Sequence, residues 1–252
     1  MSTVTGLLTA NAARWKAAKL TRASEFGPVA KRLVAAKVRY QNEEKKTGVP
    51  WFVIAVIHQR ESSQNFSRSL AQGDPWNQVS THVPKGRGPF KTWEEAAIDA
   101  LVNCAPYASR WKDWSPGGTM TLLEQYNGLG YASKGLPSPY VWSGTDQYVS
   151  GKYVADGVFS ATAVDKQLGC AGLIMAMAVL DPSISFSGNV PVLTDAPIPQ
   201  TKPPASKSDK AVVVASATAA GAATAQYGLW IGVGVAALLI VSAFLYFKFI
   251  RK

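Results

Sequence analysis

Apolar residues recur at helical spacing through much of the first part of the chain. The segment 29–48, VAKRLVAAKVRYQNEEKKTG, carries this pattern and stops at Gly48, a common helix terminator. The next segment, PWFVIAVIHQRESS, begins with Pro50, a residue that the first turn of a helix tolerates. Its unbroken apolar run is typical of a core helix. The pattern therefore predicts two successive helices, the second of them buried.

Three more helices are predicted downstream. Thr92 followed by Glu95 forms a capping-box pattern, which should open a helix through the apolar stretch AAIDALVNC. Residues 119–126 can form a short helix that ends near Gly128, and residues 164–180 predict a longer one. The expected fold class is therefore all-α.

Two long segments between these helices, 64–91 and 127–161, are rich in Gly, Pro and Ser. Such loops often carry binding sites on a rigid helical frame. A small strand or hairpin within residues 66–91 is allowed, which would make the fold α+β.

The C-terminal part has a different pattern. Residues 228–247, GLWIGVGVAALLIVSAFLYF, contain no charge, and at about 1.5 Å per residue they would span a hydrocarbon core of about 30 Å. They predict a transmembrane helix, because a core helix would have to be apolar on every face. Residues 183–210 combine five prolines with Ser, Thr and Lys, a composition typical of a tether.

The net charge of +10 is unevenly distributed, since residues 1–46 hold ten Lys and Arg against three Glu. A basic surface favours anionic polymers such as nucleic acid, acidic lipid or the bacterial wall, but it does not choose among them. Because this excess lies outside the segments that carry chemical motifs, no nucleic-acid partner is expected.

The two cysteines, Cys104 and Cys170, lack metal-ligand spacing and predict neither a zinc site nor a disulfide framework. Whether they form a single bridge stays open. No metal and no cofactor is expected. The short apolar stretch around Leu7 precedes Arg14 and Lys16 instead of following basic residues, so an ordinary cleaved secretory signal is not expected.

Glu61 ends the apolar run WFVIAVIHQRES, where the helix that carries it should partly desolvate its carboxylate. Desolvation raises the pKa of a carboxyl group, and a carboxyl that is protonated near neutral pH can donate a proton to a leaving sugar oxygen. Most Glu residues at helix ends are simply solvated, so position alone does not assign this role. His58, one turn earlier, is expected to be a core residue.

The segment HQRESSQNF resembles the helix-end Glu-Ser motif of the soluble lytic transglycosylase and goose-type lysozyme superfamily. LEQYNGLGY, further along, resembles that superfamily's Tyr-Asn-Gly segment. The stretches SLAQGDPWNQVSTHVPKGRGPF and SPYVWSGTDQYVSGKYVADGVF are similar to phage-encoded lysozyme-like domains. The resemblance covers roughly residues 48–180.

This resemblance implies that Glu61 is the catalytic acid and that Tyr126 and Asn127 line the cleft beside it. Ala71-Gln72-Gly73-Asp74 stands in the region where the superfamily has Gly-Leu-Met-Gln, and Gln72 is accordingly expected to bind substrate. Candidate sugar-stacking groups cluster in the loop-rich region around and after Asn127, and about half of them are expected to serve only in packing: Tyr126, Tyr131, Tyr140, Trp142 and Tyr148.

A second carboxylate would decide the reaction that follows proton donation. Asp74 is the first candidate to position water, because it lies in a Gly- and Pro-shaped loop shortly after the acid. Asp99 and Glu124 are weaker candidates, since both lie in predicted helices. Without such a group, the substrate's own acetamido or 6-hydroxyl group would complete the reaction, as in transglycosylases of this superfamily.

These inferences predict a peptidoglycan glycosidase, either an endolysin or a virion-associated lysin, whose partners are bacterial peptidoglycan and membrane lipid. A noncatalytic wall-binding or structural virion protein is the alternative. The expected layout is a basic segment (1–24), a lysozyme-like catalytic domain (25–182), a Pro- and Ala-rich linker (183–227), a transmembrane helix (228–247) and a basic tail (248–252).

The charges that flank the transmembrane segment predict its orientation. Lys210 stands alone on one side, against Lys248, Arg251 and Lys252 on the other. The positive-inside bias places the more basic end in the cytoplasm, and the catalytic domain then faces the periplasm or cell wall. The late emergence of this helix during synthesis suggests slow translocation, or delivery within a phage particle.

Overall fold

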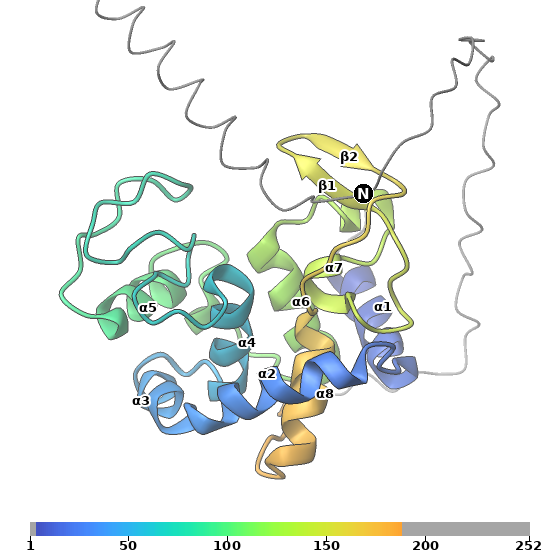
Figure 1. Cartoon of the computed structure of the whole chain (residues 1–252), viewed down its shortest axis with the longest axis horizontal. Helices are drawn as coiled ribbons and strands as arrows, with labels where there is room; N and C mark the ends of the chain where they lie inside the picture. The colour runs from blue at the N-terminus through green and yellow to red at the C-terminus, as the bar shows by residue number, and fades with distance from the viewer. Residues whose placement is uncertain (1–3, 188–252) are drawn as a thin grey trace, which may run out of the picture. The chain divides into compact units, whose positions relative to one another are not determined.

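The computed structural model describes residues 4–187, all of which belong to one compact unit. In this part the chain is mostly helical, with eight α-helices, two short 3-10 turns and one two-stranded antiparallel sheet (Figure 1). The helices are α1 (Val4–Ala17), α2 (Ala23–Ala35), α3 (Lys37–Thr47), α4 (Trp51–Ser62), α5 (Trp93–Val102), α6 (Pro116–Asn127), α7 (Pro139–Trp142) and α8 (Cys170–Leu180). The strands are β1 (Lys152–Ala155) and β2 (Val158–Ser160).

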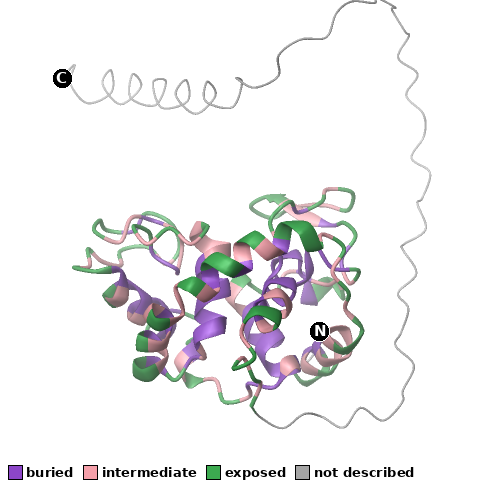
Figure 2. Cartoon of the chain, turned by 60° about the horizontal axis from the view of Figure 1, so that its bottom comes forward, coloured by how far each residue is buried: buried purple, intermediate pink, exposed green. Residues whose placement is uncertain are grey.

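Helix α4 is the centre of the fold, as the apolar run predicts. Every residue from Trp51 to His58 is buried, and α2, α3 and α8 pack around the helix. Figure 2 shows the buried residues gathered in the interior of the domain, with exposed residues on the loops. A helix that is apolar on all sides needs such surroundings, so α4 forms a rigid support for the residues at its C-terminal end.

The single helix predicted for residues 29–48 is two helices, α2 and α3, that meet at Ala36. The buried side chains explain the break. Phe26 and Leu33 belong to α2, which packs on α8, whereas Tyr40 belongs to α3, which packs on α4 and α5. One straight helix could not direct both apolar faces toward these different partners.

The predicted helix ends agree with the structure at two local signals. Gly48 caps α3 with φ of 74°, in the left-handed region that glycine adopts without strain. Thr92 caps α5, and its Oγ1 accepts a hydrogen bond of 3.2 Å from the backbone N–H of Glu95. Both predictions are confirmed. They could be made from the sequence because each depends only on neighbouring residues.

The hairpin lies elsewhere than expected. Within residues 66–91 the only strand-like pairing is an isolated bridge between Arg68 and Pro75, whereas β1 and β2 form a hairpin inside the predicted loop 127–161. Tyr153 on β1 pairs with Phe159 on β2, and both rings pack edge-on against Tyr131. This aromatic contact gives the short hairpin an apolar support.

The folded unit extends beyond both predicted boundaries. Helix α1, within the basic segment 1–24, packs against α6 and buries Leu7 and Asn11. At the other end, Phe186 packs edge-on against Trp15 and Phe52, so the first residues of the predicted 183–227 linker belong to the fold.

The remainder of that linker, the predicted transmembrane helix and the basic tail lie outside the described residues. Among residues 4–187, no helix is long and apolar enough to cross a membrane.

Candidate functional site

Glu61 lies in the last turn of α4, where the helix ends abruptly. Ser63 and Gln64 both adopt left-handed backbone conformations, with φ of 54° and 62°. Their N–H groups donate to the carbonyls of Gln59 and His58, which closes the final turn. Two successive non-glycine residues in this region are uncommon, and such strain is concentrated at functional sites. The arrangement holds the Glu61 side chain at the edge of the core.

The loop after α4 returns to contact the backbone of Glu61. Gly73 has φ of 70°, and a Cβ atom placed on it would lie 2.7 Å from the Glu61 carbonyl oxygen. Only glycine fits without displacing the loop or the helix end. The Gln72-Gly73-Asp74 turn is therefore brought against the predicted acid through its backbone.

Tyr140, on α7, is the hydrogen-bond partner of the Glu61 carboxyl group. Its hydroxyl donates to Oε1 over 2.8 Å, and the tyrosine is only 4% exposed. Burial raises the pKa of Glu61 to about 7, against the lowering effects of this hydrogen bond and of the Arg60 charge. A carboxyl with this pKa is protonated in about half of the molecules at neutral pH. The site thus meets the main chemical requirement for a general acid.

The guanidinium of a buried Arg60–Asp165 ion pair lies over the ring of Tyr140. The Arg60 guanidinium lies 4.8 Å from the centre of the Tyr140 ring, and its Nη2 donates to Asp165 Oδ2 over 2.9 Å. Lys152 Nζ, from β1, reaches Asp165 Oδ1 over 3.1 Å. Burial opposes ionisation of Asp165, but the Arg60 charge and these hydrogen bonds lower its pKa below the ordinary value. The network links α4, the hairpin and the segment before α8.

These residues border a pocket of about 350 Å³, a volume within the range of small-molecule sites. Its lining combines charged, amide and aromatic side chains from five parts of the fold: Arg60, Asn127, Gly128, Gly130, Tyr131, Pro139, Tyr140, Lys152, Tyr153, Asp165 and Gln167. Glu61 is not itself among these residues, but its chain neighbour Arg60 and its hydrogen-bond partner Tyr140 are. A ligand in the pocket would therefore meet the tyrosine that bonds the Glu61 carboxyl.

Asp74 has surroundings of a different kind. Oδ2 accepts hydrogen bonds from the backbone N–H groups of Thr81 (2.8 Å) and His82 (3.0 Å), and Oδ1 lies 2.6 Å from His82 Nδ1. Burial works against ionisation, yet these bonds lower the pKa of Asp74 below its ordinary value. Both oxygens therefore bind the 64–91 loop. The Gln72 side chain also bonds within this loop, since its amide oxygen accepts a hydrogen bond of 3.4 Å from Ser69 Oγ.

The other residues predicted to bind substrate divide into two groups. Asn127 and Tyr131 line the pocket, Asn127 exposed and Tyr131 largely buried beneath the hairpin. The Tyr131 hydroxyl accepts a hydrogen bond of 3.1 Å from the Tyr153 N–H. Tyr126 is absent from the lining, and its hydroxyl donates to the Leu70 carbonyl over 2.8 Å. Tyr126 consequently joins α6 to the loop that contacts Glu61.

The weaker carboxylate candidates have structural partners. Asp99, on α5, pairs with Arg87 and accepts a 3.0 Å hydrogen bond from Asn103. Glu124, on α6, is fully buried and accepts a 3.1 Å hydrogen bond from Asn11 of α1. These contacts fix a loop and a helix, and neither Asp99 nor Glu124 lines the pocket.

His58 is a core residue, as expected from its position on α4. Its Nδ1 lies 2.9 Å from the Tyr40 hydroxyl, and burial lowers its pKa to about 4. Cys104 and Cys170 are free thiols. Among the described residues, no group of three or more His, Cys, Asp or Glu side chains could hold a metal ion.

Several pocket residues carried no signal in the sequence. Arg60 adjoins the predicted acid, but its partner Asp165 lies 105 residues later in the chain. Lys152, which also bonds Asp165, lies on strand β1. Asp165 also falls within the helix predicted for 164–180, whereas α8 begins only at Cys170. Comparisons with protein-family models, curated proteins and solved structures found no match. The functional case therefore depends on the chemistry of the site.

Proposed function

We propose that this protein is a peptidoglycan glycosidase with a lysozyme-like catalytic domain, which cleaves the β-1,4 bond between N-acetylmuramic acid and N-acetylglucosamine. The observation that carries the proposal is the Glu61 carboxyl, whose pKa burial raises to about 7. It stands beside a pocket with polar and aromatic walls, the combination that sugar-binding sites use.

Proton transfer follows from the bonding of the two Glu61 oxygens. Oε1 accepts the Tyr140 hydrogen bond, which leaves Oε2 to carry and donate the proton. Glu61 protonates the glycosidic oxygen as its bond to the anomeric carbon breaks, and positive charge develops on the sugar ring. The Glu61 carboxylate formed in this step stays hydrogen-bonded to Tyr140, which stabilises it.

The fate of the sugar cation separates a hydrolase from a transglycosylase. Asp74 as the water-positioning base would favour hydrolysis, but both of its oxygens are bonded within its own loop. This bonding weakens that assignment and favours completion by the substrate itself. Its acetamido oxygen can first bond the anomeric carbon as an oxazolinium ion, and the 6-hydroxyl then displaces that oxygen while the Glu61 carboxylate accepts the hydroxyl proton. Reducing ends or 1,6-anhydro ends among the muropeptide products would distinguish the two reactions.

The proposal includes attachment to a membrane through residues 228–247, which lie outside the described residues. The charge bias around this segment favours a catalytic domain on the outer side of the cytoplasmic membrane, where peptidoglycan is found. An endolysin and a virion-associated lysin both fit this placement.

The direct test compares two Glu→Gln substitutions in the full-length chain on purified bacterial walls. Glu61→Gln preserves shape but cannot donate a proton, so turnover should fall by at least about 100-fold. Glu25→Gln is the matched control, because Glu25 is exposed and bonded to Arg22 on the surface. Cleared zymogram bands of equal strength from wild type and Glu61→Gln would overturn the proposal.

A further inference from the structure

The charges of the pocket are not balanced. Arg60 and Lys152 are cationic and Asp165 is anionic, so the three charged lining residues sum to +1. Arg60 forms an ion pair with Asp165 in the interior, where the two side chains are 6% and 4% exposed. Lys152 is the excess cation, and its side chain is 38% exposed.

Lys152 has hydrogen-bonding capacity left over. Its ammonium has three donors, and one of them is directed to Asp165 Oδ1. Asn127 and Gln167, which line the same pocket, are exposed and have no side-chain hydrogen bond within the described part of the chain. An ammonium beside two free amides suits a carboxylate, which accepts several hydrogen bonds at once.

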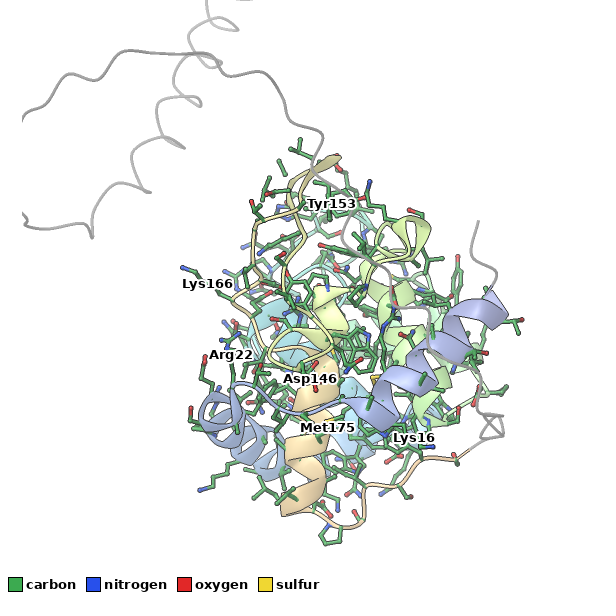
Figure 3. The ribbon with its side chains drawn as sticks, turned by 90° about the vertical axis from the view of Figure 1, so that its right-hand side faces the viewer. Lys16, Arg22, Asp146, Tyr153, Lys166 and Met175 are labelled. Carbon is green, nitrogen blue, oxygen red and sulfur yellow. The ribbon has the colours of Figure 1, made fainter. Side chains whose placement is uncertain are left out.

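The hairpin holds Lys152 in place at the pocket. Tyr153 N–H donates to the Tyr131 hydroxyl over 3.1 Å, and the Tyr153 ring packs edge-on against both Tyr131 and Phe159. Figure 3 shows Tyr153 at one end of the domain and Lys166 projecting from the surface away from it. A lysine fixed in this way loses less side-chain freedom on binding than a free surface lysine does.

From this geometry we infer that the pocket binds a carboxylate on a side branch of the glycan, with Lys152 as the residue that determines this specificity. The inference rests on the proposed function, because peptidoglycan bears such branches on its muramic acid units. The carboxylate has two sources, the lactyl group of peptide-free glycan or the stem peptide. A neutral glycan of the chitin type has neither.

The test measures binding separately from cleavage, by calorimetry on the full-length chain carrying Glu61→Gln. Three tetrasaccharides serve as probes: a muramoyl glycan with stem peptides, the same glycan without peptides, and neutral chitotetraose. Adding Lys152→Met should weaken binding of the carboxylate-bearing glycans about fivefold to tenfold, since a charged hydrogen bond is lost. Binding of chitotetraose should not change, and Lys152→Arg should retain most of the affinity.

Lys166→Met is the matched control, because Lys166 is an exposed lysine between the pocket residues Asp165 and Gln167 that does not itself line the pocket. It should leave all three affinities unchanged. A loss confined to the peptide-bearing glycan identifies the stem peptide as the carboxylate source, and a loss confined to the peptide-free glycan identifies the lactyl carboxylate, which the stem peptide otherwise converts to an amide. Losses for both muramoyl glycans show that the pocket accepts either carboxylate.

Equal losses on all three probes, or no loss on any, would overturn the inference. If the wild-type chain cleaves walls and Lys152→Met leaves the binding affinities unchanged, only the pocket assignment is refuted. Failure of wild type to cleave walls, with carboxylate binding that depends on Lys152, would instead refute the proposed reaction and support the pocket.

Discussion

Glu61, in the last turn of α4, and Asp74, within the loop that follows, are carboxylates whose surroundings give them opposite properties. Glu61 sits at the end of a buried helix with a single hydrogen-bond donor, Tyr140, and burial raises its pKa to about 7. Asp74 receives hydrogen bonds from Thr81 and His82, which lower its pKa despite burial. Stronger desolvation of Glu61 and the larger number of donors to Asp74 therefore shift the two pKa values in opposite directions.

The largest expected effect is on stability against pH. Because the pKa of folded Glu61 lies above its ordinary value of 4.5, the folded state binds more protons between about pH 4.5 and 7. Glu61 therefore destabilises the fold progressively as pH rises through this window, by up to about 3 kcal/mol. Glu61→Gln should remove this decline when urea unfolding is followed at several pH values. Parallel curves for wild type and variant would contradict the buried environment of Glu61.

Asp74 should contribute with the opposite sign. Its pKa is lowered on folding, so its stabilising contribution is present above the ordinary Asp pKa of 3.8 and is lost as pH falls below it. The two carboxylates thus predict a stability maximum between their windows.

An intermediate effect is expected for Tyr140→Phe. The variant keeps the ring beside Arg60 but removes the hydrogen bond to Glu61. Because that bond favours the ionised carboxylate, the pKa of Glu61 should rise further, and the alkaline limb of the activity profile should move to higher pH. Turnover should fall about threefold to tenfold with the loss of orientation. Tyr148→Phe is a matched control, since Tyr148 bonds the backbone of Asp165 and Gly151. An unchanged pH profile in Tyr140→Phe would show that the Tyr140 hydroxyl does not influence the pKa of Glu61.

The smallest effect on activity is expected for Asp74→Asn. If Asp74 only fixes its loop, turnover on walls should stay within about threefold of wild type, while stability falls by about 1–2 kcal/mol from the weakened bonds to His82 and Thr81. A collapse of turnover comparable to that of Glu61→Gln would restore Asp74 as a catalytic group and make hydrolysis the favoured reaction.

Local signals in the sequence predicted much of the frame. Pro50 and Thr92 marked helix starts, and the apolar run before Glu61 predicted both the core helix and the desolvated carboxyl. Each of these depends on a few consecutive residues. The break at Ala36 could not be predicted in this way, because it reflects which distant helices cover each apolar face.

The remaining parts of the site depend on pairings across the chain. Tyr140 lies 79 residues from Glu61, and Asp165 lies 105 residues from Arg60. The segment around Asp165 is predicted to be helical, yet it has no regular secondary structure, and its carboxylate bonds Arg60 and Lys152. No local pattern encodes such contacts, whereas the geometry of the folded chain displays them directly.

Titration of Glu61 tests most directly whether this residue can donate a proton at neutral pH. Carboxyl carbons of labelled glutamate can be followed by NMR across pH 3 to 9 in wild type, with Glu61→Gln identifying the Glu61 signal. A midpoint near pH 7 is expected, because burial of this carboxyl raises its pKa. A midpoint near the ordinary value of 4.5 would show an ionised carboxylate at neutral pH and would contradict its role as the acid.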